Sequence, residues 1–412
     1  MLVTALPSLY GQTTLLNWEQ IKTRFLAQNP SVVAARINVE ESKANEITAG
    51  LRPNPQLSFT SDGFQLTPHA GVWRPLAGVQ FTSGISQLIE RQNKRPLRVD
   101  SARLTTSGSG SDQQDLQRTL LFTARTAFVS TLQAKALVEI TQANLQSYDN
   151  VISANRTRFR AGDISELDFQ RVELQRVQFE SDAANARVNL RTAKIQLLAL
   201  LNERTPVDDL DLEGEFEYKE SIILLPELRQ AAVANRPDLR SAQTLIEKAR
   251  ADNRLAIANG SADPQVGGWY SRNPSFNNPF DYNTIGANVT LPIRIFDKNQ
   301  GEKARTALEI TRTQRLRDAV VSGIYRDVDS AYAALESVRT LVRPYRDKYL
   351  QESSDIRDKI SFSYKQGNAT LLEFLDAQKS YRDIQVAYIG LVGSYWSALA
   401  QLSLAVGQEV NP

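Results

Sequence analysis

One stretch of this chain occurs twice, each time between two long helical patterns. It reads FRAGDISELDF at Phe159–Phe169 and YKQGNATLLEF at Tyr364–Phe374, 205 positions later. An aromatic residue, a glycine, a Ser or Thr, a leucine, an acidic residue and a phenylalanine keep the same order in both copies. A fixed internal period is the signature of a repeated structural unit. The 412 residues are therefore predicted to hold two tandem repeats, 13–205 and 226–412, with a connector at 206–225.

The helical patterns beside this stretch are unusually long. At 1.5 Å per residue the longest would span roughly 95 Å, against an average helix of about 11 residues in globular proteins. Each pair is predicted to form a helical hairpin that turns at Gly162 or Gly367, because glycine accepts a positive φ. The four predicted helices are Pro96–Phe159, Ser165–Asn202, Lys298–Ser361 and Thr370–Val406.

One segment conflicts with a regular helix. Residues Leu104–Asp112 place Gly108 and Gly110 among serines inside the first long helix. Each helical glycine costs on the order of 1 kcal/mol relative to alanine. A kink, or a frayed and poorly ordered stretch, is therefore expected at 107–111.

Each half also carries a shorter helix and a strand pair. The helices are predicted at Asn17–Ala49, with a break at Asn29–Pro30, and from Asn235 to Ala258. Period-two alternation predicts β-hairpins at about 55–88 and 264–292. Aromatic residues near the strand ends are typical of a membrane interface, but ordinary sheet packing explains them equally well. These aromatic residues are Trp73, Trp269, Tyr270 and Tyr282.

Composition excludes several functions. Lys and Arg number 48 and Asp and Glu 46, which gives no reason to expect nucleic acid as a partner. With no cysteine and one histidine, His69, the chain has no disulfide, no thiol catalysis, no Cys/His metal cage and no expected cofactor. No catalytic motif is present, so the protein is not expected to be an enzyme. No apolar run of about 18 residues was found, so no transmembrane helix is expected.

Two further expectations concern the N-terminus and the oligomeric state. Met1–Gln12 is either the remnant of a signal peptide or an N-terminal tail. Four strands per chain are too few for a membrane barrel, because single-chain barrels start at about eight. Open sheet edges in lipid cost several kcal/mol per unpaired group. The strands must therefore either lie in water or pair with strands of other copies. The long helices also need neighbours to bury their apolar stripes, and several copies that form one tube would meet both needs.

These features together resemble the TolC-like outer-membrane efflux proteins, in particular the branch that serves heavy-metal and other RND-type pumps. The resemblance is carried by Asn29–Pro30, the two tips around Gly162 and Gly367, and the strand-to-helix junction Leu291–Gly301. It implies a mainly α fold with a small β part, in which 13–412 is one protomer. Three protomers would form a twelve-stranded barrel in the outer membrane and a long α-barrel in the periplasm.

The resemblance also implies a function. Such proteins are passive exit ducts of tripartite efflux systems, fed by an inner-membrane RND-type or other transporter through a periplasmic adaptor, the membrane fusion protein. Heavy metals, other cations or drugs are the implied cargo. The alternative is a periplasmic coiled-coil adaptor or scaffold without a membrane barrel.

The resemblance assigns two sets of residues. Tyr364, Glu373 and Asp376 match a pore gate, although Ala369 stands where some relatives have a basic partner. A solvated acidic face is the alternative for the two carboxylates, and a plain helical turn is the alternative for the tips. The residues expected to contact the adaptor are Arg160, Gly162, Asp163, Ile164, Ser165, Lys365, Gly367, Asn368, Ala369 and Thr370.

Overall fold

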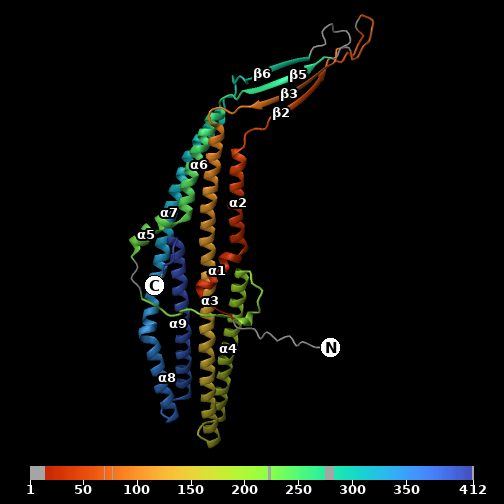
Figure 1. Cartoon of the computed structure of the whole chain (residues 1–412). Coiled ribbons are helices and arrows are strands. Elements are labelled where there is room, and N and C mark those ends of the chain that lie inside the picture. Colours follow the sequence, from red (N-terminus) through yellow and green to blue (C-terminus); the bar gives the residue numbers. More distant parts are fainter. Residues whose placement is uncertain (1–13, 69, 77, 221–223, 274–282, 411–412) are drawn as a thin grey trace, which may run out of the picture. The chain divides into compact units, whose positions relative to one another are not determined.

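The computed structural model describes residues 14–68, 70–76, 78–220, 224–273 and 283–410 (Figure 1). The chain forms two compact units, each with segments from both halves of the sequence. The helical unit comprises Met1–Ile37, Asp112–Leu239 and Val320–Pro412, and the sheet unit comprises Asn38–Ser111 and Arg240–Ala319. The expectations for Met1–Gln12, His69 and Tyr282 lie outside the described residues.

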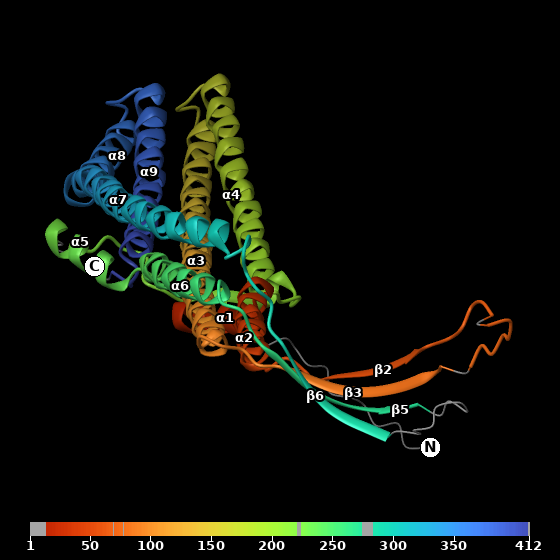
Figure 2. The ribbon, with the colours of Figure 1, turned by 90° about the horizontal axis from the view of Figure 1, so that it is seen from above.

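The sheet unit contains one four-stranded antiparallel sheet, in which the strands lie side by side in the order β2-β3-β5-β6 (Figure 2). Strands β2–β3 and β5–β6 fall within the ranges expected for the two hairpins, and β3 pairs with β5 to join them. The edge strands of the sheet are β2 and β6. The bounds are β2 Gln56–Asp62, β3 Gln80–Leu88, β5 Gln265–Arg272 and β6 Asn283–Thr290.

Successive side chains along each strand point to opposite faces of the sheet, and directly paired residues of neighbouring strands lie on the same face. In this sheet the alternation produces one apolar and one polar face. The apolar face carries eight large side chains, each at least 41% exposed: Leu57, Phe59, Phe81, Ile85, Val266, Tyr270, Ile285 and Val289. The polar face carries mainly hydroxyl and amide groups: Ser58, Thr60, Thr82, Ser86, Ser271, Thr284 and Asn288, with Trp269 among them.

The run at 107–111 is helical, so the expected kink or frayed stretch is wrong. Helix α3 (Lys94–Ala161) continues through it. Two neighbouring helices of the sheet unit pack here. Ser42 of α2 (Pro30–Gly50) places its Oγ 3.1 Å from that of Ser109. A Cβ at Gly108 would lie 3.9 Å from Thr244 of α6 (Pro237–Asn259). Small side chains let these helices approach α3, and this packing outweighs the low helix propensity of glycine.

The helical unit contains the two long hairpins. Their return helices are α4 (Glu166–Leu201) and α9 (Leu371–Val406), which begin at the two tips. Helix α4 pairs with α3, where Tyr148 stacks on Phe179 and donates to the Val172 carbonyl, and α9 pairs with α8 (Leu350–Lys365). In Figure 1 both tips lie at the same end of the unit. The remaining helices are α1 (Trp18–Gln28), α5 (Leu225–Asn235) and α7 (Gln300–Pro344).

Separate apolar clusters form the core of the helical unit. One surrounds α7 and α9 and includes fully buried Leu335, Tyr395 and Leu402. Another surrounds α1, α3 and α4 and includes Phe25 and Leu197. The mainly helical fold class predicted from the sequence is therefore confirmed.

The connector predicted at 206–225 contains regular structure. Its strand β4 (Leu210–Leu212) pairs in parallel with β1 (Thr14–Leu16), and both leucines of β4 are buried. Further along, Tyr395 Oη and Trp396 Nε1 of α9 donate hydrogen bonds to connector carbonyls at 2.7 and 3.1 Å. The connector is therefore part of the core of the helical unit.

The long helix expected at Lys298–Ser361 is not uniform. Helix α7 ends at Pro344, a π-helical turn occupies Tyr345–Tyr349, and α8 follows. Proline removes one backbone donor and its ring crowds the preceding turn, and a π-turn is one way to absorb that disturbance. Helix α3 has no such interruption, so the two long helices differ here.

Among the described residues, one helix, α9, is long and apolar enough to cross a membrane by length and composition alone. The expectation that no such segment exists is wrong by this measure. However, 61% of the apolar window is buried within the chain. Burial of this kind is typical of a core helix, which fits the place of α9 in the largest apolar cluster.

Candidate functional site

Both hairpins reverse through the same backbone motif, as the glycines predicted. Gly162 has a φ of 85° and Gly367 a φ of 77°. The N–H of the next residue, Asp163 or Asn368, donates to the carbonyl five residues earlier at 2.9 Å. This pattern is the Schellman motif, in which a left-handed residue ends a helix and satisfies its last carbonyls.

The return helices begin with side-chain caps. Ser165 Oγ accepts a hydrogen bond from the Asp168 N–H at 3.1 Å, and Thr370 Oγ1 accepts one from the Glu373 N–H at 3.3 Å. The Glu373 carboxylate folds back and accepts from the backbone N–H of Thr370 at 2.7 Å. That bond, together with one from the Thr370 hydroxyl, holds the pKa of Glu373 below its usual value. Glu373 therefore has a capping role that the gate assignment did not include.

The tips present mostly exposed side chains. Of the ten residues expected to contact an adaptor, only Ile164 and Ala369 are partly buried, and these two occupy equivalent positions in the two repeats. The other eight are exposed: Arg160, Gly162, Asp163, Ser165, Lys365, Gly367, Asn368 and Thr370. Both tips thus offer similar surfaces of small and polar groups.

An aromatic pair closes each tip. Phe159 stacks on Phe169 with ring centroids 5.3 Å apart, and Tyr364 stacks on Phe374 at 4.7 Å. The pairs join the last turn before each glycine to the first turn of the return helix. They explain why the repeated stretch keeps an aromatic residue at each end.

Tyr364 also joins the two hairpins. Its side chain is 6% exposed, and its hydroxyl donates to Asn155 Oδ1 of α3 at 3.0 Å. The Arg158 guanidinium lies over the Tyr364 ring, 4.9 Å from the centroid, and donates to the Tyr364 carbonyl at 3.4 Å. The structure therefore places the predicted gate tyrosine at the seam between the hairpins.

The chemistry of this seam favours a neutral tyrosine. Burial raises the pKa of Tyr364, and this effect outweighs the opposing charge of Arg158. The phenol keeps its proton at neutral pH and can donate to Asn155. Asn155 is buried and uses its Nδ2 to donate to the Val151 carbonyl at 2.9 Å, which leaves Oδ1 as the acceptor.

Asn155 and Arg158 were not among the residues selected from the sequence. A signal for Asn155 existed, because it follows Tyr148 and Ile152 at helical spacing on a face that is otherwise buried. A polar residue in such a stripe needs a hydrogen-bond partner. The identity of that partner could not be read from the sequence, since Tyr364 lies more than 200 positions away.

Asp376 is exposed and lies three residues after Glu373, so both carboxylates share one helix face. Over the described part of the chain, no group of three or more His, Cys, Asp or Glu side chains could hold a metal ion. One chain thus places the two predicted gate carboxylates on the same helix face, but its described residues supply too few ligands there to hold a metal ion. A ring of carboxylates at this level would need other copies.

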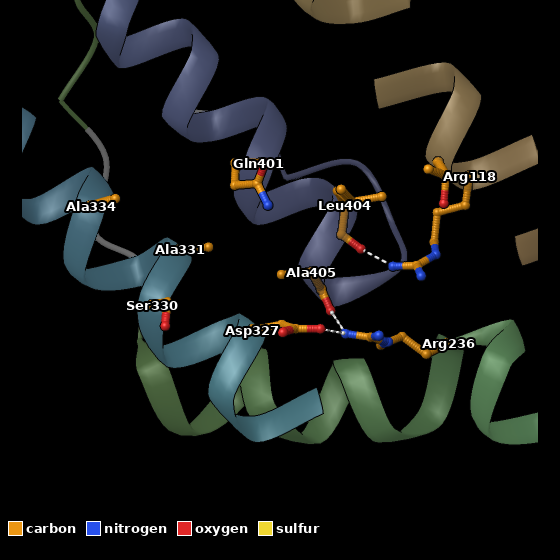
Figure 3. Close-up of a pocket in the computed structure, with 10 residues that line it drawn as sticks. Arg118, Arg236, Asp327, Ser330, Ala331, Ala334, Gln401, Leu404 and Ala405 are labelled. Carbon is orange, nitrogen blue, oxygen red and sulfur yellow. Dashed lines mark hydrogen bonds and ion pairs between the residues drawn. The ribbon is translucent and has the colours of Figure 1, made fainter. Parts of the chain in front are cut away.

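A pocket of about 280 Å³ opens at the C-terminal end of α9 (Figure 3). The Arg118 guanidinium donates to the Leu404 carbonyl, and Arg236 Nη1 donates to the Ala405 carbonyl at 3.3 Å. Arg236 also pairs with Asp327 at 3.0 Å. Two arginines thus satisfy the last carbonyls of a helix and complement its negative end, which is a structural role.

The return helix of the first repeat is also capped at its C-terminal end by a polar side chain. Asn29 donates from Nδ2 to the Leu200 carbonyl at 3.0 Å, near the end of α4. Leu200 and Ala405 are 205 positions apart, and Asn29 and Arg236 each precede a proline that begins a helix. Asn29 of the Asn29–Pro30 pair therefore caps the return helix of its own repeat.

Replacing Arg236 is expected to destabilise the helical unit by about 2 kcal/mol. Burial alone would raise the pKa of Asp238, but the hydrogen bond and charge of Arg236 hold that pKa below its ordinary value of 3.8. The stability that the folded protein gains from the lowered pKa of Asp238 is present above pH 3.8, the ordinary pKa of the group. It is lost as the pH falls through the lower pKa of Asp238 in the folded protein. In Arg236→Met a buried cation is lost, Asp238 loses its ion-pair partner, and Asp327 keeps only its pair with exposed Arg326. Loss of a fully buried pair costs several kcal/mol, and the expected effect is smaller here because both carboxylates are partly exposed to solvent.

Thermal unfolding followed by circular dichroism at neutral pH measures this effect. Arg326→Met is the matched control, because Arg326 pairs with the same Asp327 but is 75% exposed. Its unfolding temperature should stay close to that of the unaltered protein. An equal decrease in unfolding temperature in Arg236→Met and Arg326→Met would contradict the capping role of Arg236.

The fold and the tips together define a class. Two long helical hairpins and a four-stranded sheet with an exposed apolar face are the parts of a TolC-like protomer. The family model described as outer membrane efflux protein matches residues 23–203 and again 228–408. The chain belongs to this family, and its function as an efflux exit duct of the outer membrane follows.

Individual relatives agree with this assignment. The chain is similar to the cobalt-zinc-cadmium resistance protein CzcC of Cupriavidus metallidurans, with 21% identity over 92% of this chain and 87% of that protein. It shares its fold with a membrane protein from Pseudomonas aeruginosa at 17% identity and a TM-score of 0.78, covering 95% of this chain and 90% of the other. The open state of the Neisseria gonorrhoeae MtrE outer membrane channel gives 18% identity and a TM-score of 0.75, covering 98% and 94%.

Proposed function

We propose that this protein works as a homotrimeric exit duct of a tripartite efflux system. The apolar face of the sheet is the observation that carries the proposal. Its eight large side chains are between 41% and 85% exposed in the single chain. An exposed apolar surface of this size marks a contact with lipid or with another protein. For a protein of the outer membrane, lipid is the natural contact.

The sheet edges support the trimer. In lipid, each unpaired backbone group at the edges of β2 and β6 would cost several kcal/mol. Three copies supply twelve strands and can pair every edge around one axis. The polar face then borders the interior of the barrel, and the apolar face borders the membrane.

The tips are the entrance of the duct in this proposal. Hydrogen bonds and stacking at Tyr364, Asn155 and Arg158 hold the two hairpins of one protomer together. Glu373 and Asp376 of three copies form acidic rings that favour cations. The exposed tip residues around Gly162 and Gly367 contact the periplasmic adaptor, and their matching geometry supports one mode of contact for both tips.

We infer the cargo from the ligand groups that the chain contains and from the relatives. CzcC is named for resistance to cobalt, zinc and cadmium, which supports metal cations as cargo, with drugs as the other candidate. The chain has no cysteine and one histidine, so it has few soft ligands to retain such ions. It conducts cargo without chemistry, while an RND-type or other inner-membrane transporter supplies the energy.

Arginine substitutions on β6 test the membrane assignment. Ile285→Arg on the apolar face is expected to reduce the outer-membrane fraction strongly, because an arginine facing lipid costs about 2–4 kcal/mol at the bilayer midplane. Thr284→Arg, one residue away on the polar face, should insert normally. Membrane fractionation with quantitative immunoblotting measures both. Equal insertion of the two variants would rule out a lipid contact for the apolar face.

A further inference from the structure

Trp269 is the one large aromatic side chain among the described residues of the sheet's polar face. Its direct neighbours in the register are Gly84 on β3 and Gly286 on β6. A Cβ built on Gly286 would lie 2.4 Å from Trp269 Cζ2 and 2.6 Å from Cε2. The indole therefore packs against Gly286, in a space that a Cβ would fill. Trp269 is nevertheless only partly buried, so part of the residue stays accessible in the single chain.

The surface around this indole is polar but nearly uncharged. Thr82 Oγ1 donates to Ser271 Oγ at 3.1 Å, and Gln265 Nε2 donates to Ser86 Oγ at 2.7 Å, so these groups satisfy one another. In the described strands, Asp62 at the end of β2 is the only ionisable side chain on this face. A cation near the middle of the sheet therefore meets neutral dipoles and one electron-rich ring.

We propose that Trp269 forms a binding platform for organic cations inside the membrane barrel. The inference rests on the proposed function, since the polar face borders a shared lumen only if several copies close around it. Tryptophan has the most favourable ring for attracting a cation, and quaternary ammonium groups bind such rings without needing a carboxylate. Three indoles, one from each copy, then line the lumen at the same height.

If Trp269 only stabilises the sheet, its substitution is expected to have a different effect on cation block. An aromatic side chain over a strand glycine also stabilises a sheet by covering the exposed backbone. Leucine at position 269 keeps an apolar cover but has no π face. Phenylalanine keeps a smaller π face. The two substitutions therefore separate cover from cation binding.

The test is block of single-channel current in planar bilayers by tetraethylammonium. Trp269→Leu should raise the half-blocking concentration about two- to fivefold, as expected for one exposed cation–π contact, with Trp269→Phe in between. Tyr270→Leu is the matched control, because Tyr270 is the next residue on β5 but lies on the apolar face. It should leave the block unchanged.

A second measurement needs no variant. An uncharged carbon isostere of tetraethylammonium should block the unaltered channel at least twofold more weakly than the cation. Equal block by the two molecules, or equal block of the unaltered and Trp269→Leu channels, would overturn the platform while leaving the duct in place. Absence of any conductance from the unaltered protein would overturn the proposed duct and this inference with it.

Discussion

Gly162→Val and Gly367→Val are each expected to weaken adaptor binding about tenfold, because forcing a β-branched residue into the left-handed region costs roughly 1–2 kcal/mol and 1.4 kcal/mol is a tenfold change. Both glycines have φ near 80°, and a Cβ at either would meet no atom within 4 Å. Any loss therefore arises from backbone strain in the turn and not from a clash. The trimer should still assemble, because the tips are exposed. Binding to the purified adaptor and export by cells measure the effect.

Asparagine at the same positions is the matched control. It also has a Cβ but tolerates the left-handed conformation, so Gly162→Asn and Gly367→Asn should bind the adaptor nearly as well as the unaltered protein. Full export by both valine variants would refute the assignment of the tips. An equal defect in the asparagine variants would indicate that any side chain at the tip disturbs the contact.

Removal of the carboxylates at the second tip is expected to raise single-channel conductance and to weaken block by divalent cations on the order of tenfold, because acidic rings concentrate cations at a pore entrance. The variant is Glu373→Gln with Asp376→Asn. Glutamine at position 373 can still accept the Thr370 N–H bond, so the capping box survives and only the charge is lost. Alanine there would also uncap α9 at a cost of about 1 kcal/mol.

The first tip provides the control for this prediction. Asp168 is the counterpart of Glu373 in the repeat, and its N–H is capped by Ser165 in the same way. Asp168→Asn should leave conductance and divalent block nearly unchanged if the gate belongs to the second hairpin. Identical traces from the unaltered and doubly substituted channels would remove Glu373 and Asp376 from the gate.

Local patterns predicted a large part of the fold. The repeated stretch located both tips, because a positive-φ glycine followed by a Ser or Thr cap is a local signal with a local cause. The break at Asn29–Pro30 marked the start of α2, and period-two alternation located the four strands. The second short helix was predicted from Asn235, whereas α6 begins at Pro237. Each of these features depends on a few neighbouring residues, which is why the sequence alone was enough.

Other features depend on contacts between distant segments. Strand β4 forms because Leu210 and Leu212 find β1 and a buried site, although three residues carry little strand signal. The run at 107–111 is helical because α2 and α6 pack on it. The bond between Tyr364 and Asn155 joins the two repeats, and although the position of Asn155 in a buried stripe indicates that it needs a partner, neither repeat alone identifies that partner. Tertiary packing decides these cases, and propensity is a weak guide to them.

The number of chains in a conducting particle tests the central claim most directly. The purified protein would be inserted into lipid nanodiscs for native mass measurement, and the same preparation would be examined in planar bilayers. Three copies of the 46.0 kDa chain per particle, together with discrete ohmic channels, are the expected result. Single chains per particle without conductance would contradict the account, since one four-stranded sheet would then be stable without partners to close it.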